Sequence, residues 1–397
     1  MSTRLKVGLI GLGAIGAGMH VKYLDDLPSV ELTGVCDQVK EKADQIAEQY
    51  RTTAFYDYKE LYEKADLDVV ILAVPHYDHP KLAVEAFKRG IHVLCEKPIA
   101  VHLNDARMMT EAYEEARKQY PKLQFGLMFQ ERTLPFYRKV KEIVASGQLG
   151  RLTRATWIHT AWFRSQIYYD SGDWRATWAG EGGGILTNQC PHTLDMYQWL
   201  FGLPARIAGH AHIGKYHNIE VEDEVTAYFE HENGMIGHLV ATTAEIPGTN
   251  RLEIIGEYGK LVLEEGEITL HKNPESMLKY SQETTHRFSQ MTAEKSIVPY
   301  DKDAPAGHQV VAEAFFHRIQ NGDSHELIAE GWEGERSLVL ANGIMLSSFQ
   351  DRTIQVPIDA DAYEAKLKEL ASQSTYVKDV SAAAAANEDL SKSFGSL

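Results

Sequence analysis

The sequence is poor in cysteine, short of basic residues and without long apolar runs, and each shortage excludes a class of protein. Its 397 residues include three cysteines, Cys36, Cys95 and Cys190. Their odd number and wide spacing exclude a disulfide framework or a zinc ribbon and are typical of a reducing compartment. Lysine and arginine number 40 against 56 acidic residues, a formal net charge of −16, which argues against a nucleic-acid or anionic-membrane partner.

Apolar stretches are short throughout the chain. No run approaches the roughly 18 apolar residues of a membrane-spanning helix, so we expect no membrane contact. The first six residues lead into an apolar strand without the pattern of a signal peptide, and we expect a cytoplasmic protein. The length predicts two or three domains.

A glycine-rich segment follows the first predicted strand, 7–10. It reads Gly-Leu-Gly-Ala-Ile-Gly, in which the glycines allow a tight turn, close approach of the backbone to a pyrophosphate, and close packing of helix on strand. The pyrophosphate then lies at a helix N-terminus. The residues assigned to the cofactor here are Gly11, Gly13, Ala14, Ile15 and Gly16.

The second predicted strand, 30–36, ends at Asp37, 21 residues after Gly16. A carboxylate at this place accepts hydrogen bonds from the ribose hydroxyls of NAD and repels the 2′-phosphate of NADP. We therefore predict NAD as the cofactor, with NADP less favoured. The alternative is a glycine-rich turn in an unrelated βαβ unit.

Two further apolar runs, 68–75 and 91–95, predict strands buried on both faces of a parallel sheet. Pro75, His76 and His79 come at the end of the first run, and we assign them to the cofactor in preference to a metal ion.

The second apolar run leads directly into Glu96-Lys97-Pro98. The proline excludes helical geometry at Lys97, and ligands of open α/β sheets bind beyond the carboxyl ends of the strands. Lys97 is therefore expected to point at the ligand, with Glu96 beside it as a further cofactor contact.

The pattern changes after about residue 150, where predicted strands with hairpin-like turns replace the alternation of strand and helix. The strands are expected at 152–162, 206–213, 223–230, 235–243, 251–256 and 260–264, with one strong helix, Ile185–Phe201, and loops or short edge elements over 273–305. We predict an α/β Rossmann domain with a doubly wound parallel sheet over 1–130. An α+β domain with a large open, mostly antiparallel sheet follows over 131–358, and a partly disordered extension over 359–397.

The predicted helix 185–201 brings polar residues to one face. Asn188, His192 and Asp195 lie four and three residues apart, which is helical spacing. Pro191 requires the helix to begin near it or to bend there. Taken alone, the pattern allows Asn188 to be a helix cap, and it favours His192 as a half-buried core histidine over a functional one.

Aromatic and arginine side chains are concentrated just before this helix. Flat apolar faces beside hydrogen-bonding groups suit a sugar ring, with its C–H faces and its rim of hydroxyls. The predicted substrate contacts are Trp162, Arg164, Tyr168, Trp174, Arg175 and Asn188. Arg132, Arg164 and Arg175 could also serve a phosphate or carboxylate.

Three motifs together resemble the glucose–fructose oxidoreductase/inositol dehydrogenase (Gfo/Idh/MocA) family from residue 5 to about 357. They are Gly11-x-Gly13-x-x-Gly16, Glu96-Lys97-Pro98, and Gly183-Gly184-x-Leu186-x-Asn188-x-x-x-His192-x-x-Asp195. The resemblance implies a nicotinamide cofactor, a sugar, inositol or related polyol substrate, and a homodimer or homotetramer formed through the C-terminal sheet. It also implies that Lys97 and His192 are catalytic. Asn188 stands where inositol dehydrogenases usually have an aspartate, which puts a strict inositol dehydrogenase in doubt.

The hypothesis that follows is an NAD-dependent dehydrogenase that reversibly oxidises a secondary hydroxyl of a sugar, glycoside or inositol. His192 can take the hydroxyl proton near neutral pH, while Lys97 either stabilises the developing alkoxide as a cation or acts as the base. The rival activity is glycoside cleavage through transient oxidation at C3 and elimination. A non-catalytic sensor of sugar or NAD is a more remote alternative.

Overall fold

The computed structural model describes residues 4–322 and 325–375. The chain forms two compact units, which we call the first and second unit. The first comprises Met1–Thr133, Gly180–Gly182 and Pro305–Leu338, and the second Leu134–Ala179, Gly183–Ala304 and Val339–Leu397. Residues 305–338 thus belong with the N-terminal unit, in contrast to the predicted 131–358 domain. The physical reason is that Phe315 and Phe316 are buried in the core of that unit.

The first unit is built on a six-stranded sheet in which every paired strand is parallel, as predicted. Its order is β3-β2-β1-β4-β5-β6, so the order reverses between β1 and β4. The strands are β1 (Leu5–Ile10), β2 (Val30–Cys36), β3 (Ala54–Phe55), β4 (Val69–Leu72), β5 (His92–Cys95) and β6 (Phe125–Leu127).

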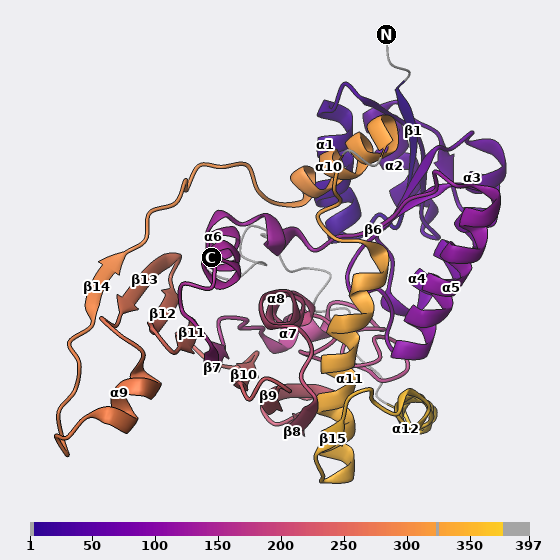
Figure 1. Cartoon of the computed structure of the whole chain (residues 1–397). Coiled ribbons are helices and arrows are strands. Elements are labelled where there is room, and N and C mark those ends of the chain that lie inside the picture. The colour runs from indigo at the N-terminus through magenta and orange to yellow at the C-terminus, as the bar shows by residue number, and fades with distance from the viewer. Residues whose placement is uncertain (1–3, 323–324, 376–397) are drawn as a thin grey trace. The chain divides into compact units, whose positions relative to one another are not determined.

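Helices cover both faces of this sheet, which explains why its central strands are apolar throughout. Along β4, Val70 and Leu72 enter one hydrophobic cluster, while Val69 and Ile71 enter the other. Figure 1 shows α10, in orange, beside α1 on one face, and α4 and α5 on the other. The helices are η1 (Gly16–His20), α1 (Val21–Asp26), α2 (Lys40–Tyr50), α3 (Tyr58–Lys64), η2 (His76–Asp78), α4 (His79–Phe87), α5 (Leu103–Gln119), η3 (Gln130–Thr133), α10 (His308–Asn321) and η5 (Gly331–Glu333).

The second unit is built on a nine-stranded sheet in which β7 and β10 pair in parallel and the other pairs are antiparallel. The order is β14-β13-β12-β11-β7-β10-β9-β8-β15. The strands are β7 (Leu152–His159), β8 (Arg206–Ile213), β9 (Glu222–Glu230), β10 (Ile236–Thr242), β11 (Asn250–Gly256), β12 (Gly259–Glu264), β13 (Glu267–Lys272), β14 (Glu294–Ile297) and β15 (Ile354–Gln355). This matches the predicted large open sheet.

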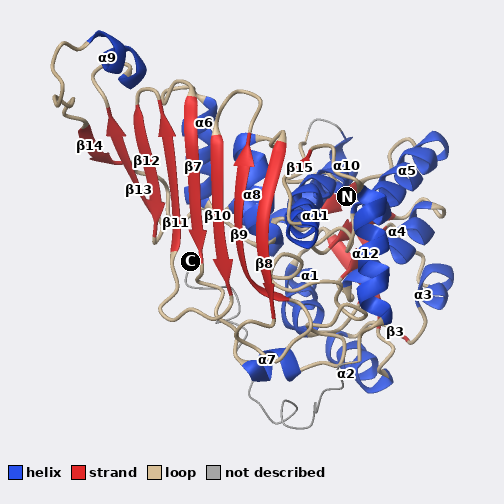
Figure 2. Cartoon of the chain, turned by 90° about the horizontal axis from the view of Figure 1, so that it is seen from below, coloured by secondary structure: helices blue, strands red, loops and turns tan. Residues whose placement is uncertain are grey.

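Two helices, α6 (Pro135–Ala145) and α8 (Pro191–Phe201), pack on one face of this sheet. The rings of Tyr137 and Trp157 lie 5.9 Å apart, and those of Tyr197 and Phe229 lie 4.8 Å apart. Figure 2 shows the strands in front and α6 and α8 behind them. The remaining helices are α7 (Gln166–Asp170), α9 (Met277–Glu283), α11 (Gly334–Gln350, whose residues 339–350 belong to this unit) and α12 (Ala360–Ser372).

The predicted helix Ile185–Phe201 is wrong at its start, because α8 begins at Pro191 and residues 185–190 form turns. Proline lacks the N–H that a helix interior needs, but the first helical position does not use that group. Asn188 therefore does not share a helical face with His192 and Asp195.

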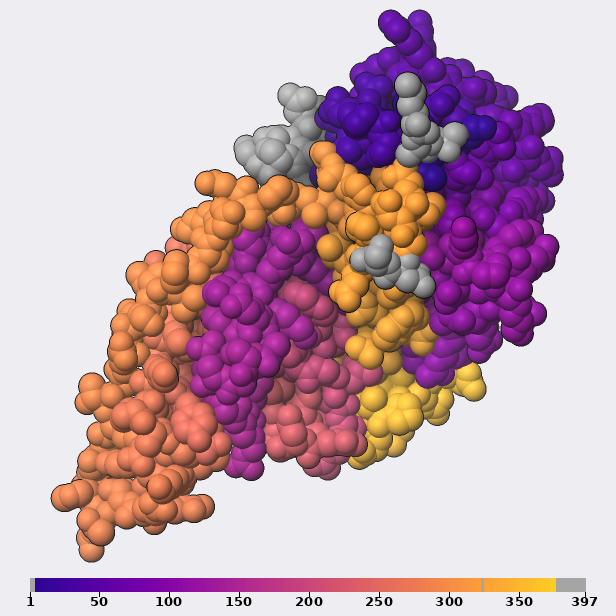
Figure 3. All heavy atoms as spheres, turned by 45° about the horizontal axis from the view of Figure 1, so that its top comes forward, coloured from indigo at the N-terminus to yellow at the C-terminus, as the bar shows by residue number. Residues whose placement is uncertain are grey.

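The region after β12 contains elements that the sequence pattern did not predict. Strand β13 and helix α9 were missed, whereas β14 is an edge strand of the kind expected within 273–305. Figure 3 shows this segment in orange beside α6, and the rings of Phe136 and Tyr300 lie 6.4 Å apart there. The predicted extension contains α12, and residues 376–397, expected to be disordered, lie outside the described part of the chain. Within that part, no helix is long and apolar enough to cross a membrane.

Candidate active site

The glycine-rich segment lies directly after β1, and the geometry of each glycine differs. Gly11 has a φ of +93°, and a Cβ there would lie 2.2 Å from the Ala73 carbonyl oxygen. A Cβ on Gly16 would lie 1.9 Å from the Gly11 carbonyl oxygen, so neither position accepts a side chain. A Cβ on exposed Gly13 would meet no protein atom within 4 Å. The bare backbone at Gly13 is the surface that a pyrophosphate can approach.

Asp37, at the end of β2, is fixed against this glycine-rich segment. Its Oδ2 accepts a hydrogen bond from the Leu12 N–H at 2.8 Å, and its Oδ1 accepts one from the Val39 N–H at 2.8 Å. The side chain is half-buried, and a carboxylate has about four lone-pair sites, so acceptor capacity remains for ribose hydroxyls. The residues of this loop therefore fit a dinucleotide.

The residues after β4 divide into two kinds. Pro75 precedes η2, and the buried His76 has its Nδ1 3.4 Å from the Glu181 carbonyl oxygen. His79 is fully buried, with Nδ1 2.8 Å from the Pro98 carbonyl oxygen and Nε2 3.0 Å from that of Val74. Both its nitrogens thus face main-chain carbonyls, and burial lowers the pKa of its imidazole. His79 therefore connects the segments that follow β4 and β5 through hydrogen bonds. This structural role differs from the expected cofactor contact.

Glu96 follows β5 and is buried, with 7% exposure. Its Oε1 lies 2.8 Å from Nε2 of His20, and its Oε2 accepts a hydrogen bond from the Lys97 N–H at 3.3 Å. Burial by itself would raise the pKa of this carboxyl, but the hydrogen bond and charge of His20 lower it to about 2. Glu96 is therefore an ionised group directed at His20, which differs from the predicted cofactor contact.

The proposed cofactor residues of the first unit share one edge of the sheet. Asp37 follows β2, the glycine-rich segment follows β1, Pro75 and His76 follow β4, and Lys97 follows β5. These four strands are neighbours in the order β2-β1-β4-β5. The site thus lies at the topological switch point, where open α/β sheets bind their ligands. Among the described residues, no group of three metal-ligating side chains was found.

In the second unit, four of the predicted substrate contacts form one cluster. Arg175 donates from Nη1 to the Tyr168 hydroxyl at 2.9 Å, and its guanidinium carbon lies 4.6 Å from the ring centres of both Tyr168 and Trp174. The guanidinium carbon of Arg164 lies 5.1 Å from the Tyr168 ring centre. Stacking of guanidinium groups on aromatic rings fixes both. Gln189, which was not predicted, donates to the same hydroxyl at 3.2 Å.

Two other predicted arginine and aromatic contacts are structural. Trp162 is buried and its ring lies 4.9 Å from that of His159. Arg132, of the first unit, is buried and donates from Nη1 to the Ile328 carbonyl oxygen at 3.1 Å and to Glu333 Oε2 at 3.0 Å. These contacts place both side chains within the packing of their own units.

His192 lies in the first turn of α8 and is 4% exposed, and Asn188 lies half-buried in the turn before it. The turn is held by Glu222, whose carboxylate accepts hydrogen bonds from the Gly184 N–H at 2.9 Å and the Leu186 N–H at 3.0 Å. A Cβ on Gly184 would lie 2.0 Å from the Glu222 carbonyl oxygen. The glycines thus permit the predicted close backbone approach, here to β9.

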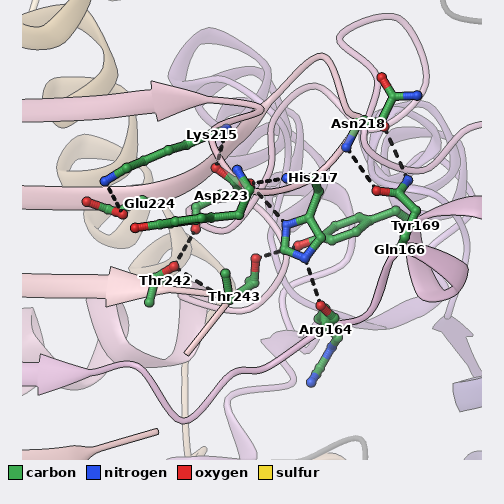
Figure 4. A network of polar contacts seen from close by, with 12 residues as sticks. Arg164, Gln166, Tyr169, Lys215, His217, Asn218, Asp223, Glu224, Thr242 and Thr243 are labelled. Carbon is green, nitrogen blue, oxygen red and sulfur yellow. Dashed lines mark hydrogen bonds and ion pairs between the residues drawn. The ribbon is translucent and has the colours of Figure 1, made fainter. Parts of the chain in front are cut away.

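A second carboxylate of β9, Asp223, holds the segment that contains Arg164 and Tyr169 (Figure 4). Asp223 is fully buried and accepts hydrogen bonds from the main-chain N–H groups of Lys215 at 2.9 Å, Tyr216 at 2.8 Å and His217 at 3.0 Å. Its Oδ2 also lies 3.0 Å from His217 Nδ1, and His217 Nε2 lies 2.9 Å from the Arg164 carbonyl oxygen. No local pattern predicts this pairing, since these residues are far from the recognised motifs.

Two family models match the chain and together cover more than half of it. One, described as the oxidoreductase family with an NAD-binding Rossmann fold, matches residues 5–122, and the other, the GFO/IDH/MocA C-terminal domain, matches residues 137–262. The chain belongs to the Gfo/Idh/MocA oxidoreductase family, and its first unit is an NAD-binding Rossmann domain. The resemblance read from the three motifs is confirmed.

Curated relatives include two sugar and polyol dehydrogenases. The inositol 2-dehydrogenase of Rubrobacter xylanophilus is 34% identical over 201 residues, 50% of this chain and 52% of that protein. The D-glucoside 3-dehydrogenase of Escherichia coli is 31% identical over 217 residues, 53% and 58% of the two chains. The chain thus spans about half the length of these relatives.

Among solved structures, the WlbA dehydrogenase of Bordetella pertussis in complex with NADH and UDP-GlcNAcA has a similar fold. Its TM-score is 0.74 at 25% identity, over 90% of this chain and 100% of that one. The likeness extends over both units of the fold.

Proposed function

We propose that the protein is an NAD-dependent dehydrogenase that reversibly oxidises a secondary hydroxyl of a sugar, glycoside or inositol to the ketone. The observation that carries the proposal is that Asp37, Gly13, His76 and Lys97 follow four neighbouring parallel strands. This arrangement puts the Glu96-Lys97-Pro98 lysine at the edge of the sheet that binds the dinucleotide.

The proposed substrate class rests on the relatives and on the second-unit cluster. The relatives act on inositols and glucosides by their names, and Tyr168 and Trp174 with Arg164 and Arg175 offer flat faces and donors to a sugar ring. Asn188 supplies an amide that hydrogen-bonds hydroxyls but cannot take a proton. We therefore favour a sugar or glycoside over a strict inositol substrate.

Lys97 and His192 are the proposed catalytic residues. Bound NAD supplies the acceptor for hydride. The Lys97 ammonium group stabilises the developing alkoxide, and the His192 imidazole takes the hydroxyl proton. The main-chain N–H of Lys97 is held by the ionised Glu96, which helps to fix the backbone from which the lysine side chain extends.

The test is a spectrophotometric screen for NAD reduction over inositols, free aldoses, glycosides and sugar acids. Lys97→Met and His192→Ala should each lower kcat by at least about a hundredfold on the best substrate. The exposed residues Lys88 and His286 provide matched controls, and Lys88→Met and His286→Ala should leave kcat unchanged. Near wild-type turnover in both site variants would refute the assignment. Release of an aglycone without accumulation of NADH would instead support the glycoside-cleaving alternative.

The outer face of the nine-stranded sheet and the cysteines bear on the assembly of the protein and on its location in the cell. We propose a homodimer or homotetramer that uses the sheet face opposite α6 and α8, and a cytoplasmic enzyme. The support for the first is the mixed character of that face, on which Ile158 lies with Arg154, Thr156, Arg251 and Glu253 around a shallow depression. The support for the second is that Cys36, Cys95 and Cys190 are buried and none of them forms a disulfide bond, as in reducing compartments.

A further inference from the structure

A buried chain of polar groups runs from the end of η1 to the main chain of Lys97, entirely within the first unit. The Tyr23 hydroxyl hydrogen-bonds His20 Nδ1, His20 Nε2 lies 2.8 Å from Glu96 Oε1, and Glu96 Oε2 accepts the Lys97 N–H at 3.3 Å. Tyr23, His20 and Glu96 are 5%, 0% and 7% exposed. These hydrogen-bonded side chains are shielded from water, and they join two segments of the protein that lie 76 residues apart in sequence.

These hydrogen-bonded groups connect the cofactor loop with the proposed catalytic lysine. His20 is the last residue of η1, and η1 begins at Gly16, the last glycine of the dinucleotide motif. Glu96 directly precedes Lys97. One carboxylate thus contacts the helix that starts at the cofactor loop with one oxygen, and the backbone of the proposed catalytic lysine with the other.

Stability alone does not account for a buried carboxylate and its polar partner at this place. Removing these groups from water costs free energy that their interaction only partly offsets, and apolar side chains of similar volume are often as stable or more so. A third group, His308 on α10, faces the same carboxylate with its Nε2 3.8 Å from Glu96 Oε1. Three polar side chains therefore meet at a point in the core where apolar ones would pack, which indicates a role beyond packing.

Glu96 does not act by touching the substrate or the cofactor. Both its oxygens are engaged by groups of the first unit, and its side chain is almost completely covered. Whatever it contributes to the reaction must pass through His20 or Lys97.

We propose that His20 and Glu96 are positioning residues that couple occupation of the glycine-rich loop to the placement of Lys97. When a dinucleotide seats on the loop, η1 is fixed, His20 fixes the Glu96 carboxylate, and the carboxylate fixes the main-chain N–H of Lys97. This inference rests on the proposed function only in giving Lys97 a catalytic role. The coupling itself is a property of the first unit.

The first experiment measures the coupling without turnover. Acylation of Lys97 by a lysine-reactive anhydride is followed by mass spectrometry with and without ADP-ribose, which occupies the loop but has no nicotinamide ring to cover Lys97. We expect ADP-ribose to change the Lys97 labelling rate at least threefold in the wild-type protein. The change should disappear in His20→Gln and Glu96→Gln, while the binding of ADP-ribose itself weakens by less than about threefold.

The second experiment uses turnover and separates positioning from loss of structure. His20→Gln and Glu96→Gln should each lower kcat by about ten- to a hundredfold, because misplacing a catalytic group by a small distance causes losses of this size. The double variant should be no slower than the slower single one, because both break the same chain. Tyr23→Phe removes only the hydroxyl at the far end, keeps the fold, and should lower kcat by a few-fold. Its matched control is Tyr113→Phe, which removes a buried hydroxyl bonded to the Leu123 carbonyl oxygen elsewhere in the unit.

The outcomes distinguish this inference from the proposed function. An ADP-ribose effect on Lys97 labelling that persists in His20→Gln and Glu96→Gln would overturn the coupling, and so would kcat losses that multiply in the double variant. If either variant fails to fold, the comparison of Tyr23→Phe with Tyr113→Phe decides, and equal kcat in those two would overturn it. If no substrate is turned over, the proposed function fails, whereas the labelling result still decides the coupling.

Discussion

The Asp37 carboxylate and the Leu12 N–H are joined by a hydrogen bond of 2.8 Å, which fixes the acid at the end of β2 against the glycine-rich loop. In the role proposed for it, a carboxylate in this place favours the ribose diol of NAD and repels the 2′-phosphate of NADP. Asp37→Ala should weaken NAD binding by about tenfold, which is the loss of one charged hydrogen bond. It should also raise the ratio of NADP to NAD affinity.

Isothermal titration with both cofactors measures this change. Asp26→Ala is the control, because Asp26 is an exposed acid at the end of α1, and it should leave both affinities unaltered. A wild-type preference for NADP would contradict the role given to Asp37.

Gly13→Ala tests the cradle that the bare backbone forms. A methyl group at Gly13 meets no protein atom within 4 Å, so the thermal stability of the free protein should change by no more than a degree or two. The methyl group nevertheless occupies the surface where the pyrophosphate approaches, and NAD affinity should fall by at least about thirtyfold, roughly 2 kcal/mol.

The companion variant Gly16→Ala should behave in the opposite way. Its methyl group would lie 1.9 Å from the Gly11 carbonyl oxygen, so it should lower the melting temperature of the protein even without NAD. Differential scanning fluorimetry measures the melting temperatures of both variants. Equal melting temperatures for Gly13→Ala and Gly16→Ala would contradict the loop geometry.

The parts of the fold that could be predicted from sequence are those fixed by local patterns. Strand β4 is apolar at every position because Val69 and Ile71 face one core and Val70 and Leu72 the other. The glycine-rich loop and Asp37 follow their strands at fixed offsets, so the cofactor edge could be assembled without knowing any tertiary contact. The antiparallel strands of the second unit were found by alternation and turn residues.

The parts that could not be predicted depend on contacts between distant segments. Nothing local assigns Phe315 and Phe316 to the N-terminal core, or joins His20 to Glu96 across 76 residues. The start of α8 was misplaced because the helical spacing of Asn188 and His192 suggested a longer helix, whereas α8 begins at Pro191. His79 was assigned to the cofactor from its position after β4, whereas its nitrogens face carbonyls that only the fold brings near.

Buried histidines predict loss of stability in mild acid. Burial lowers the pKa of His159 to about 3, below the ordinary value near 6.5. Between these values the unfolded chain binds a proton that the folded protein does not, so His159 makes stability rise with pH, and this contribution is lost as pH falls below about 6.5. One such group changes the free energy of unfolding by about 1.4 kcal/mol per pH unit.

His159→Phe should therefore reduce the difference in unfolding free energy between pH 7 and pH 5 by about 2 kcal/mol. Urea unfolding followed by tryptophan fluorescence measures it, because five of the six tryptophans lie in the second unit with His159. His286→Phe, at an exposed position, is the control. An unchanged pH dependence in His159→Phe would show that this imidazole is not held neutral.

The proposed homodimer or homotetramer uses the face of the nine-stranded sheet opposite α6 and α8, and this can be tested by substitution. Ile158 of β7 pairs with Arg251 of β11 on this face, and both are only partly buried in the single chain. Ile158→Glu places a charge at the centre of the proposed contact and should convert the oligomer into a monomer at micromolar concentration. Analytical ultracentrifugation decides this, with Phe288→Glu as the control at a residue 93% exposed elsewhere in the unit. An unchanged mass for Ile158→Glu would exclude assembly through this face.

The buried Asp223 should affect both the stability of the second unit and its binding of substrate. Its carboxylate accepts hydrogen bonds from three main-chain N–H groups and contacts His217, whose other nitrogen faces the Arg164 carbonyl oxygen. Asp223→Asn keeps the shape but turns an NH₂ group toward those donors, so it should lower the unfolding free energy by about 1–3 kcal/mol.

The effect of Asp223→Asn on activity should be selective. Release of the Arg164 carbonyl frees the segment that contains Tyr168, so the KM for the sugar should rise by about tenfold, while the NAD dissociation constant stays the same because NAD binds the first unit. Tyr169→Phe is the matched control, since it removes one buried hydrogen bond to Thr243 Oγ1 (2.7 Å) from the same segment but leaves the Asp223–His217 contact. It should cost only about 1 kcal/mol and raise the KM less than threefold. A parallel loss of NAD affinity in Asp223→Asn would mean that the carboxylate supports the whole chain and has no selective role in holding the substrate segment.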